Sequence, residues 1–166
     1  MSKLRPNFFD LFSLPVKFEI DLVDLEQKYL QLQTKFHPDK SSLGDINRSI
    51  EINEANKTLS DNFLRACYIL NLEGIDILND ENSVRLDFEM LEEVLELQEE
   101  IEQISEQNQV QILQNKINEK VTGLILTAVE SLEQKLLNQA AKNLVEAKYL
   151  KKSLKDLNTR KQKLRQ

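Results

Sequence analysis

Apolar residues recur at intervals of three and four between about Asp21 and Phe36, which is the spacing of one face of an α-helix. The members of this stripe are Leu22, Leu25, Tyr29, Leu32 and Phe36. Asp21 can cap the first turn through its side chain. Pro38 ends the pattern, because proline has no N–H and disfavours helical geometry at the preceding His37. The sequence therefore predicts a helix that stops at His37 and is followed by a stiff polar corner.

Three longer amphipathic patterns fill the second half of the chain. They run from about Val84 to Ile104, from about Gln109 to Leu137 and from about Gln139 to Leu164. Their apolar seams are formed by Met90, Val94, Leu97, Ile101 and Ile104, by Val110, Leu113, Ile117, Val121, Leu124, Ala128, Leu132 and Leu136, and by Ala147, Leu150, Leu154, Leu157 and Leu164. Seams of this kind pack antiparallel helices into a bundle.

The two halves meet in a stretch without helical periodicity. We expect one domain over residues 1–74, a connection over 75–83 and a three-helix bundle over 84–166. The connection holds Ile75, Ile77 and Leu78, so it should pack down rather than act as a free linker. Three glycines and three prolines in 166 residues leave little punctuation, which favours an all-α fold with long helices.

Composition limits the classes of function and the compartment. The net charge of −6 argues against general nucleic-acid binding, which favours a basic surface. No apolar run is long enough to span a membrane. Cys67 is the only cysteine, so no internal disulfide is possible and a reducing compartment is expected. The N-terminus lacks a secretory apolar region, which points to the cytoplasm, with the mitochondrial matrix as the alternative.

The sequence gives little support for catalysis. One histidine and one cysteine cannot make a clustered metal site, and neither a glycine-rich phosphate loop nor a Gly-x-Ser-x-Gly elbow occurs. His37 and Asp39 form a nominal base with an orienting carboxylate, but nothing supplies a nucleophile beside them. We therefore expect no enzyme, no catalytic residue, no metal and no cofactor.

Charge is distributed unevenly over the second half. Residues 87–106 hold nine acidic side chains and no basic one, whereas residues 142–165 hold nine basic and two acidic ones. In one interpretation, two neighbouring helices attract each other across their flanks. In the other, each helix presents a surface to a partner. An RNA or membrane partner for the basic helix is the weaker version, because leucines run through it and Tyr149 is its only aromatic residue.

Several motifs, taken in their order along the chain, resemble known families. The polar corner His37-Pro38-Asp39-Lys40, between two helical patterns, resembles the signature loop of J domains. Flanking segments resemble other parts of that domain, namely Phe8 to Pro15, Ile52 to Leu59, and Asp61, Arg65, Ala66 and Tyr68. The run from Met90 to Glu100 is similar to the first C-terminal helix of the HscB family, the J-type co-chaperones of iron–sulfur cluster assembly. The resemblance covers essentially the whole chain.

The resemblance implies an N-terminal J domain that stimulates the ATPase of a DnaK-type chaperone, and it favours the specialised HscA type. His37, Pro38, Asp39 and Lys40 would contact this chaperone. Lys28 and Lys35 lie seven residues apart on one side of the preceding helix and would add a basic face. This face is sparser than in many J domains, since glutamine occupies the neighbouring positions 27, 31 and 33.

For the C-terminal bundle, the resemblance implies that it holds the cluster scaffold protein IscU. A second apolar row, Phe88, Leu91 and Leu95, runs beside the seam of the helix from Val84, and Val145 and Tyr149 lie off the seam of the last helix. A wide apolar face could bury both rows. The HscB client surface instead matches Leu91, Leu95 and Tyr149, with Phe88 beside them and a polar rim formed by Glu96, Glu99 and Glu100.

Two other functions stay open from the sequence. The chain could be a J protein that serves a general DnaK chaperone with another client. It could also be a helical interaction scaffold whose J domain no longer triggers ATP hydrolysis.

Overall fold

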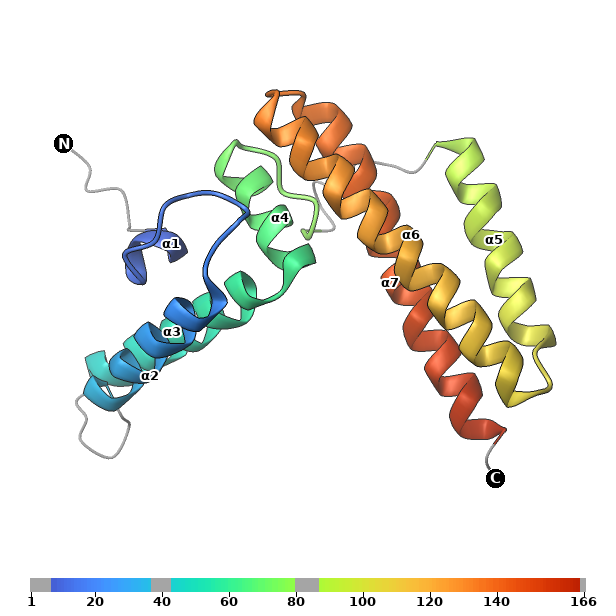
Figure 1. Cartoon of the computed structure of the whole chain (residues 1–166), viewed down its shortest axis with the longest axis horizontal. Coiled ribbons are helices and arrows are strands. Elements are labelled where there is room, and N and C mark those ends of the chain that lie inside the picture. The colour runs from blue at the N-terminus through green and yellow to red at the C-terminus, as the bar shows by residue number, and fades with distance from the viewer. Residues whose placement is uncertain (1–6, 37–42, 80–86, 165–166) are drawn as a thin grey trace. The chain divides into compact units, whose positions relative to one another are not determined.

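The computed structural model describes residues 7–36, 43–79 and 87–164 (Figure 1). The described chain is helical, which confirms the predicted all-α class. It divides into two compact units, residues 1–69 and 70–166. This division falls inside the fourth helix, so the boundary that the sequence places after Gly74 stays a prediction.

The first unit is built on four helices: α1 Phe8–Leu11, α2 Leu22–Lys35, α3 Leu43–Ser60 and α4 Asn62–Leu72, of which α4 continues into the second unit. Its core is closed by side chains from the first three of them and their loops, namely Phe9, Phe12, Leu14, Leu25, Ile52, Ala55 and Leu59. The predicted helix from Asp21 to Phe36 is confirmed, with these two residues as its caps, and Asp21 accepts hydrogen bonds from the backbone N–H groups of Val23 and Asp24.

The apolar stripe of α2 differs from the prediction at one end. Leu25 is buried, and Tyr29, Leu32 and Phe36 pack partly buried against the core. Leu22, which the stripe includes, is 47% exposed. Leu22 is the first residue of α2 and lies at the edge of the core. Periodicity alone therefore overestimates its burial.

Buried polar side chains fasten α4 to the rest of the first unit. The Arg65 guanidinium donates hydrogen bonds to the carbonyl oxygens of Phe18 and Leu59 and lies 4.6 Å from the centre of the Phe18 ring. Burial lowers the pKa of Arg65, and the nearby carboxylates of Glu19 and Asp61 oppose that change. Arginine remains charged throughout the physiological range, so this contact satisfies two carbonyls with one cation.

Tyr68 of α4 also fastens this helix to the first unit, through contacts with the N-terminus of α1. Its hydroxyl accepts a hydrogen bond of 2.9 Å from the Phe8 N–H, and its ring stacks on Phe8 with centroids 4.5 Å apart. Burial raises the pKa of Tyr68. Asn7 and Asp10 cap the same turn reciprocally. A helix of one turn is therefore held by caps and by an aromatic contact, since it is too short to be stable by itself.

The second unit contains α5 Phe88–Gln103, α6 Gln107–Glu133 and α7 Leu137–Lys163. A short connection joins α6 and α7 into an antiparallel hairpin, which holds most of the unit's buried apolar side chains. Those of α6 are Val110, Leu113, Ile117, Val121, Ile125, Ala128, Val129 and Leu132, and those of α7 are Ala140, Ala141, Leu144, Val145, Ala147, Leu150 and Leu157. The helix α5 adds Met90 and Ile101, and Ile104 is buried just after it. None of the described helices is long and apolar enough to cross a membrane.

The predicted bundle helices are confirmed, but their ends are corrected. The helix α6 ends four residues before the predicted Leu137, because Lys135 turns the chain with a φ of 59°. Leu136 extends the apolar pattern into this turn, yet it is 53% exposed. The helix α5 begins at Phe88, where Asp87 caps it, and the predicted start at Val84 lies outside the described residues. Apolar periodicity continued past the end of α6 and concealed it.

The segment after α4 packs unevenly. Ile77 is 1% exposed, and its carbonyl accepts a hydrogen bond of 3.0 Å from the Lys148 ammonium. Leu78 is 45% exposed instead. One isoleucine anchors the segment while its neighbour faces solvent.

Gly123 lies in the interior of α6, and a Cβ atom there would meet nothing within 4 Å. The Gly123→Ala variant should therefore gain about 1 kcal/mol in free energy of unfolding, since alanine removes the backbone entropy cost of glycine. Gly74→Ala is the matched control of opposite sign, because Gly74 has a φ of +95° that strains other residues. Denaturant unfolding of both variants measures the effect, and a loss of stability in Gly123→Ala would contradict it.

Candidate binding surfaces

The predicted chaperone-binding corner, His37, Pro38, Asp39 and Lys40, lies outside the described residues. The structure does describe the helices on either side of it. Asn53 of α3 accepts hydrogen bonds from Tyr29 (2.9 Å) and Gln33 (2.6 Å) of α2. These contacts hold the C-terminal half of α2 against α3 and so fix the point at which the chain leaves α2.

The basic face predicted on α2 is partly neutralised. The Lys28 ammonium lies 2.7 Å from a carboxylate oxygen of Asp24, one turn earlier in the same helix. The Lys35 ammonium lies 5.5 Å from the centre of the Phe36 ring. An exposed pair one turn apart contributes only a few tenths of a kcal/mol, so an acidic partner can displace Asp24 at little cost.

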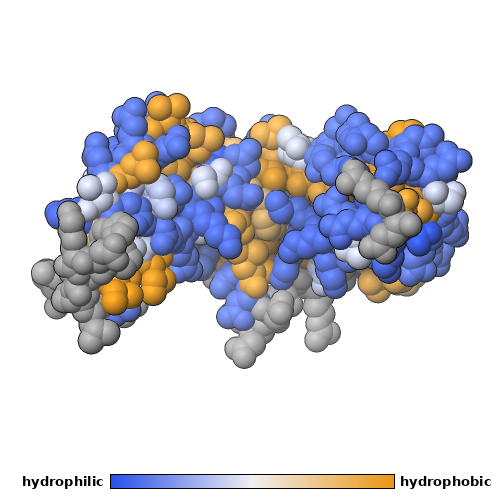
Figure 2. Space-filling model, turned by 90° about the horizontal axis from the view of Figure 1, so that it is seen from below, coloured by the Kyte–Doolittle hydropathy of each residue, from blue (hydrophilic) through white to orange (hydrophobic). Residues whose placement is uncertain are grey.

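The second apolar row of α5 is exposed. Phe88 is 80% exposed, Leu91 45% and Leu95 57%, whereas Met90 and Ile101 of the seam are buried. The alternative in which one wide face buries both rows is therefore excluded for this helix. Figure 2 shows apolar side chains that interrupt the hydrophilic surface on the face drawn there. An uncovered phenylalanine beside two leucines marks a candidate interaction surface.

Contacts between α5 and α7 place Tyr149 on this surface. Asp87 pairs with Lys142, Gln98 donates to Ser153 and Asp156, and the Arg160 guanidinium donates to the Ile104 carbonyl. The two residues of each contact therefore lie 55 to 58 positions apart in the sequence, and the contacts follow the same order along α5 and α7. The two helices run parallel, and Tyr149 falls level with Leu91 and Leu95. It is 36% exposed.

Val145, which the sequence places off the seam with Tyr149, is 3% exposed and belongs to the core. The α7 seam is wider than predicted because α7 contacts both α5 and α6. A helix with two neighbours needs a broader apolar face than a helix with one. Of the two residues, only Tyr149 is available to a partner.

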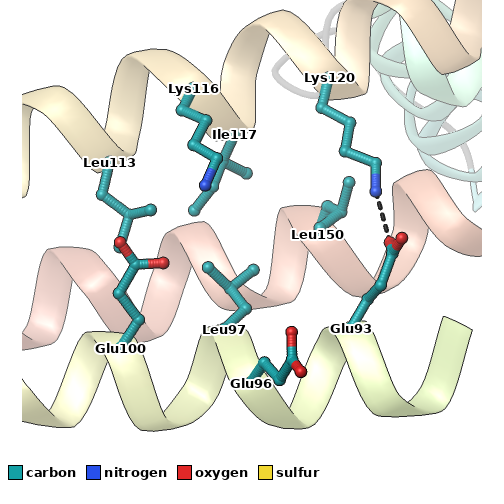
Figure 3. A pocket seen from close by; sticks show the side chains of 9 residues that line it. All are labelled: Glu93, Glu96, Leu97, Glu100, Leu113, Lys116, Ile117, Lys120 and Leu150. Carbon is teal, nitrogen blue, oxygen red and sulfur yellow. Dashed lines mark hydrogen bonds and ion pairs between the residues drawn. The ribbon is translucent and has the colours of Figure 1, made fainter.

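The three predicted rim glutamates lie on different sides of α5. Glu99 is exposed one turn after Leu95, beside the apolar row. Glu96 and Glu100 instead line a groove between α5 and α6 (Figure 3). The position four residues after a helical residue shares its face, whereas the next position is rotated by about 100°. The rim therefore extends around the helix rather than enclosing the apolar row.

The α5–α6 groove has an apolar floor and walls of opposite charge. Figure 3 shows Glu93, Glu96 and Glu100 on α5 across from Lys116 and Lys120 on α6. The space holds about 280 Å³. Its floor is formed by Leu97, Leu113, Ile117 and Leu150.

Lys120 joins all three helices of the bundle at one end of this groove. Its ammonium lies 2.5 Å from Glu93 of α5 and 2.9 Å from Glu146 of α7. Burial acts in the opposite direction, but the two hydrogen-bonded carboxylates raise the pKa of Lys120. The pair between Lys142 and Asp87 adds a second ionic contact at the start of α5. The hydrogen bond from Lys142, together with that from the Met90 N–H, lowers the pKa of Asp87.

The sequence did not single out Lys120 or Arg160 as links between helices. The available signal was weak, because each is one cation among many on a polar helix face. The sequence does show that residues 87–106 hold nine acidic side chains and no basic one. Any lysine or arginine that α6 or α7 presents to α5 was therefore a candidate for an ion pair with it. Among the described residues, no group of three histidine, cysteine or acidic side chains gathers to hold a metal ion.

A helical J-type unit followed by a three-helix bundle with an uncovered apolar row defines a two-part co-chaperone. Residues 86–158 match the family model described as HSCB C-terminal oligomerisation domain. The co-chaperone protein HscB homolog of Acinetobacter baylyi is 41% identical over 121 residues, which cover 72% of this chain and 70% of that protein. The corresponding homolog of Acinetobacter baumannii is 38% identical over a match that covers 72% of this chain and 69% of that protein. The chain belongs to the HscB family of co-chaperones.

Solved structures agree with this assignment. The chaperone HscB from Vibrio cholerae is 28% identical and superposes with a TM-score of 0.81. The match covers 95% of this chain and 99% of that one. The human co-chaperone protein HscB superposes with a TM-score of 0.84, and the match covers 95% of this chain and 83% of that one. Its sequence identity is 22%, so this likeness supports the fold and nothing further. The J-domain and iron–sulfur assembly class predicted from the sequence is therefore confirmed.

Proposed function

We propose that this co-chaperone stimulates the ATPase of an HscA-type, DnaK-family chaperone and delivers the iron–sulfur scaffold protein IscU to it in the cytoplasm. The first unit triggers hydrolysis through His37, Pro38, Asp39 and Lys40, assisted by Lys28 and Lys35. The second unit holds the client. Coupling arises because one chain brings the client and the ATPase together.

The exposed row on α5 is the observation that supports the client half of this proposal most directly. Phe88, Leu91, Leu95 and Tyr149 expose apolar area that no described part of the second unit covers. The removal of such area from water contributes about 25 cal/mol per Å², so a protein with a matching apolar patch gains binding energy there. Glu99 beside the row, with Glu96 and Glu100 further around α5, supplies the polar border of such an interface.

Single-turnover ATP hydrolysis by an HscA-type chaperone tests the proposal. The full chain alone should accelerate hydrolysis, and the chain together with IscU should accelerate it further, because delivery adds the client's own effect. A general DnaK chaperone serves as the comparison.

Three outcomes would contradict the proposal in different ways. Equal acceleration of both chaperones, with no effect of IscU, would indicate a general J protein with another client. Acceleration of neither chaperone would indicate a helical interaction scaffold without a working J domain. Acceleration of HscA without any binding of IscU would remove the client half alone.

A further inference from the structure

A strip of positive charge borders the apolar row on its α7 side. A helical residue four positions after Tyr149 is rotated from it by about +40°, and one three positions after it by about −60°. Ser153 takes the first direction and accepts a hydrogen bond from Gln98 of α5. Lys152 therefore lies on the side of Tyr149 that is turned away from α5, and Lys155 lies further around in the same direction. Both lysines are exposed, and together they form the basic strip.

A strip of negative charge borders the row on its other side. Glu99 lies one turn after Leu95, and Glu92 lies one turn after Phe88. Gln98 bonds to α7, and the next residue of a helix is rotated from it by about 100°, so Glu99 points away from α7. Both glutamates are exposed, and together they form the acidic strip.

The two strips run alongside the same stretch of the row. The helices α5 and α7 are parallel, with contacting residues 55 to 58 positions apart. Lys152 and Lys155 are therefore at about the level of Leu95 and Glu99. Across the surface from α7 to α5, a partner meets positive charge, then apolar side chains, then negative charge.

These charges do not serve the fold of the second unit. None of the four side chains in the strips makes a hydrogen bond or ion pair with a residue that the structure describes. The ion pairs that join the helices are made by others, such as Lys120 with Glu93 and Lys142 with Asp87. A partner that covers the row removes water from the charges beside it, which is unfavourable unless the partner brings opposite charges.

We propose that the two strips determine how the scaffold protein is oriented on the client surface. The docking face of the scaffold then has an apolar centre, an acidic patch that meets the basic strip and a basic patch that meets the acidic strip. An apolar row alone would accept a partner turned by 180° in the plane of the surface, whereas the strips set like charges against a partner turned in this way. The inference rests on the proposed function, because it takes the IscU-type scaffold protein as the occupant.

Calorimetric titration of the full chain with IscU, at low and at physiological salt, tests the inference. Lys152→Glu/Lys155→Glu should weaken binding by about tenfold or more at low salt, because it turns two attractions into repulsions. Glu92→Lys/Glu99→Lys should weaken binding to a similar extent. The difference between each variant and the parent should shrink as salt rises, since exposed charges are screened.

The two variants separate local complementarity from net charge. They move the net charge of −6 in opposite directions, so if net charge governed affinity, one of them would bind more tightly than the parent. A fourfold variant with all of these exchanges keeps the net charge of the parent. It should bind no better than either double variant. A turned scaffold cannot rescue it, because the row is not symmetric: Tyr149 lies on α7 and the other apolar side chains lie on α5.

Glu119→Lys/Glu130→Lys, on exposed positions of α6, is the matched control for charge. It changes the net charge as Glu92→Lys/Glu99→Lys does, yet it should bind the scaffold like the parent. Unchanged melting temperatures verify that the variants are folded.

Parent-like binding by either double variant overturns the inference, as does recovery of parent affinity in the fourfold variant or an equal loss in the control. The proposed function is tested separately by the parent chain. If the parent does not bind IscU at all, the client half of that function fails and the inference fails with it.

Discussion

Replacing Leu91, Leu95 and Tyr149 together with alanine should weaken binding of the scaffold protein about 100-fold, which corresponds to roughly 3 kcal/mol. The three side chains are level with one another on α5 and α7 and are 45%, 57% and 36% exposed. Truncation removes apolar area that is free to be buried by a partner, and it opens no cavity in the core. The melting temperature and the ATPase stimulation without client should therefore stay close to those of the parent chain.

Calorimetric titration with the scaffold protein measures the loss. Ile112→Ala/Leu126→Ala is the matched control, since these α6 residues are 68% and 51% exposed but lie away from the apolar row. The control should bind like the parent. Unchanged affinity of the triple variant would discard the proposed client surface, and a collapsed melting temperature would show that its residues support the core.

Exchange of His37 for glutamine should abolish stimulation of the chaperone ATPase. The sequence predicts that the imidazole lies at the end of a helix, with Pro38 stiffening the corner behind it. Hydrogen bonds from Tyr29 and Gln33 to Asn53 hold the C-terminal half of α2 against α3, directly before the corner. A single polar replacement at the corner leaves this hairpin intact.

The single-turnover assay should give the unstimulated rate for His37→Gln, while circular dichroism and scaffold binding stay unchanged. Glu26→Gln, an exposed position on another side of α2, should retain full stimulation. Parent-level stimulation by His37→Gln would remove the corner from the mechanism. Loss of helicity would instead show that the histidine supports the fold.

Helix positions could be predicted from the sequence because the apolar period is strong and the caps are local. The helix α2 begins one residue from the predicted start at Asp21, since the capping carboxylate acts within its own turn. The turn between α6 and α7 was predicted a few residues too late, because Lys135 takes a positive φ without a glycine to signal it. Periodicity also placed Leu22 and Leu136 inside, where the geometry of a helix end leaves them exposed.

The candidate surfaces were less predictable because they depend on what neighbouring helices leave uncovered. Periodicity showed two apolar rows on α5, but it could not decide whether the second row would be buried with the first or exposed. The same pattern around Val145 gave a buried residue, since α7 has neighbours on two sides. Glu96 and Glu99 read alike in the sequence, yet one lines a groove toward α6 and the other borders the apolar row.

The hairpin of α6 and α7 has a consequence for how this family can diversify. Most of the buried apolar side chains of the unit lie on these two helices, whereas α5 is attached in large part by Lys120, Lys142, Gln98 and Arg160. Mutations on the outer side of α5 therefore carry little folding penalty. Selection can exchange one client for another there while the hairpin core stays under constraint, so most of the recognition surface can change without altering the residues on which folding depends.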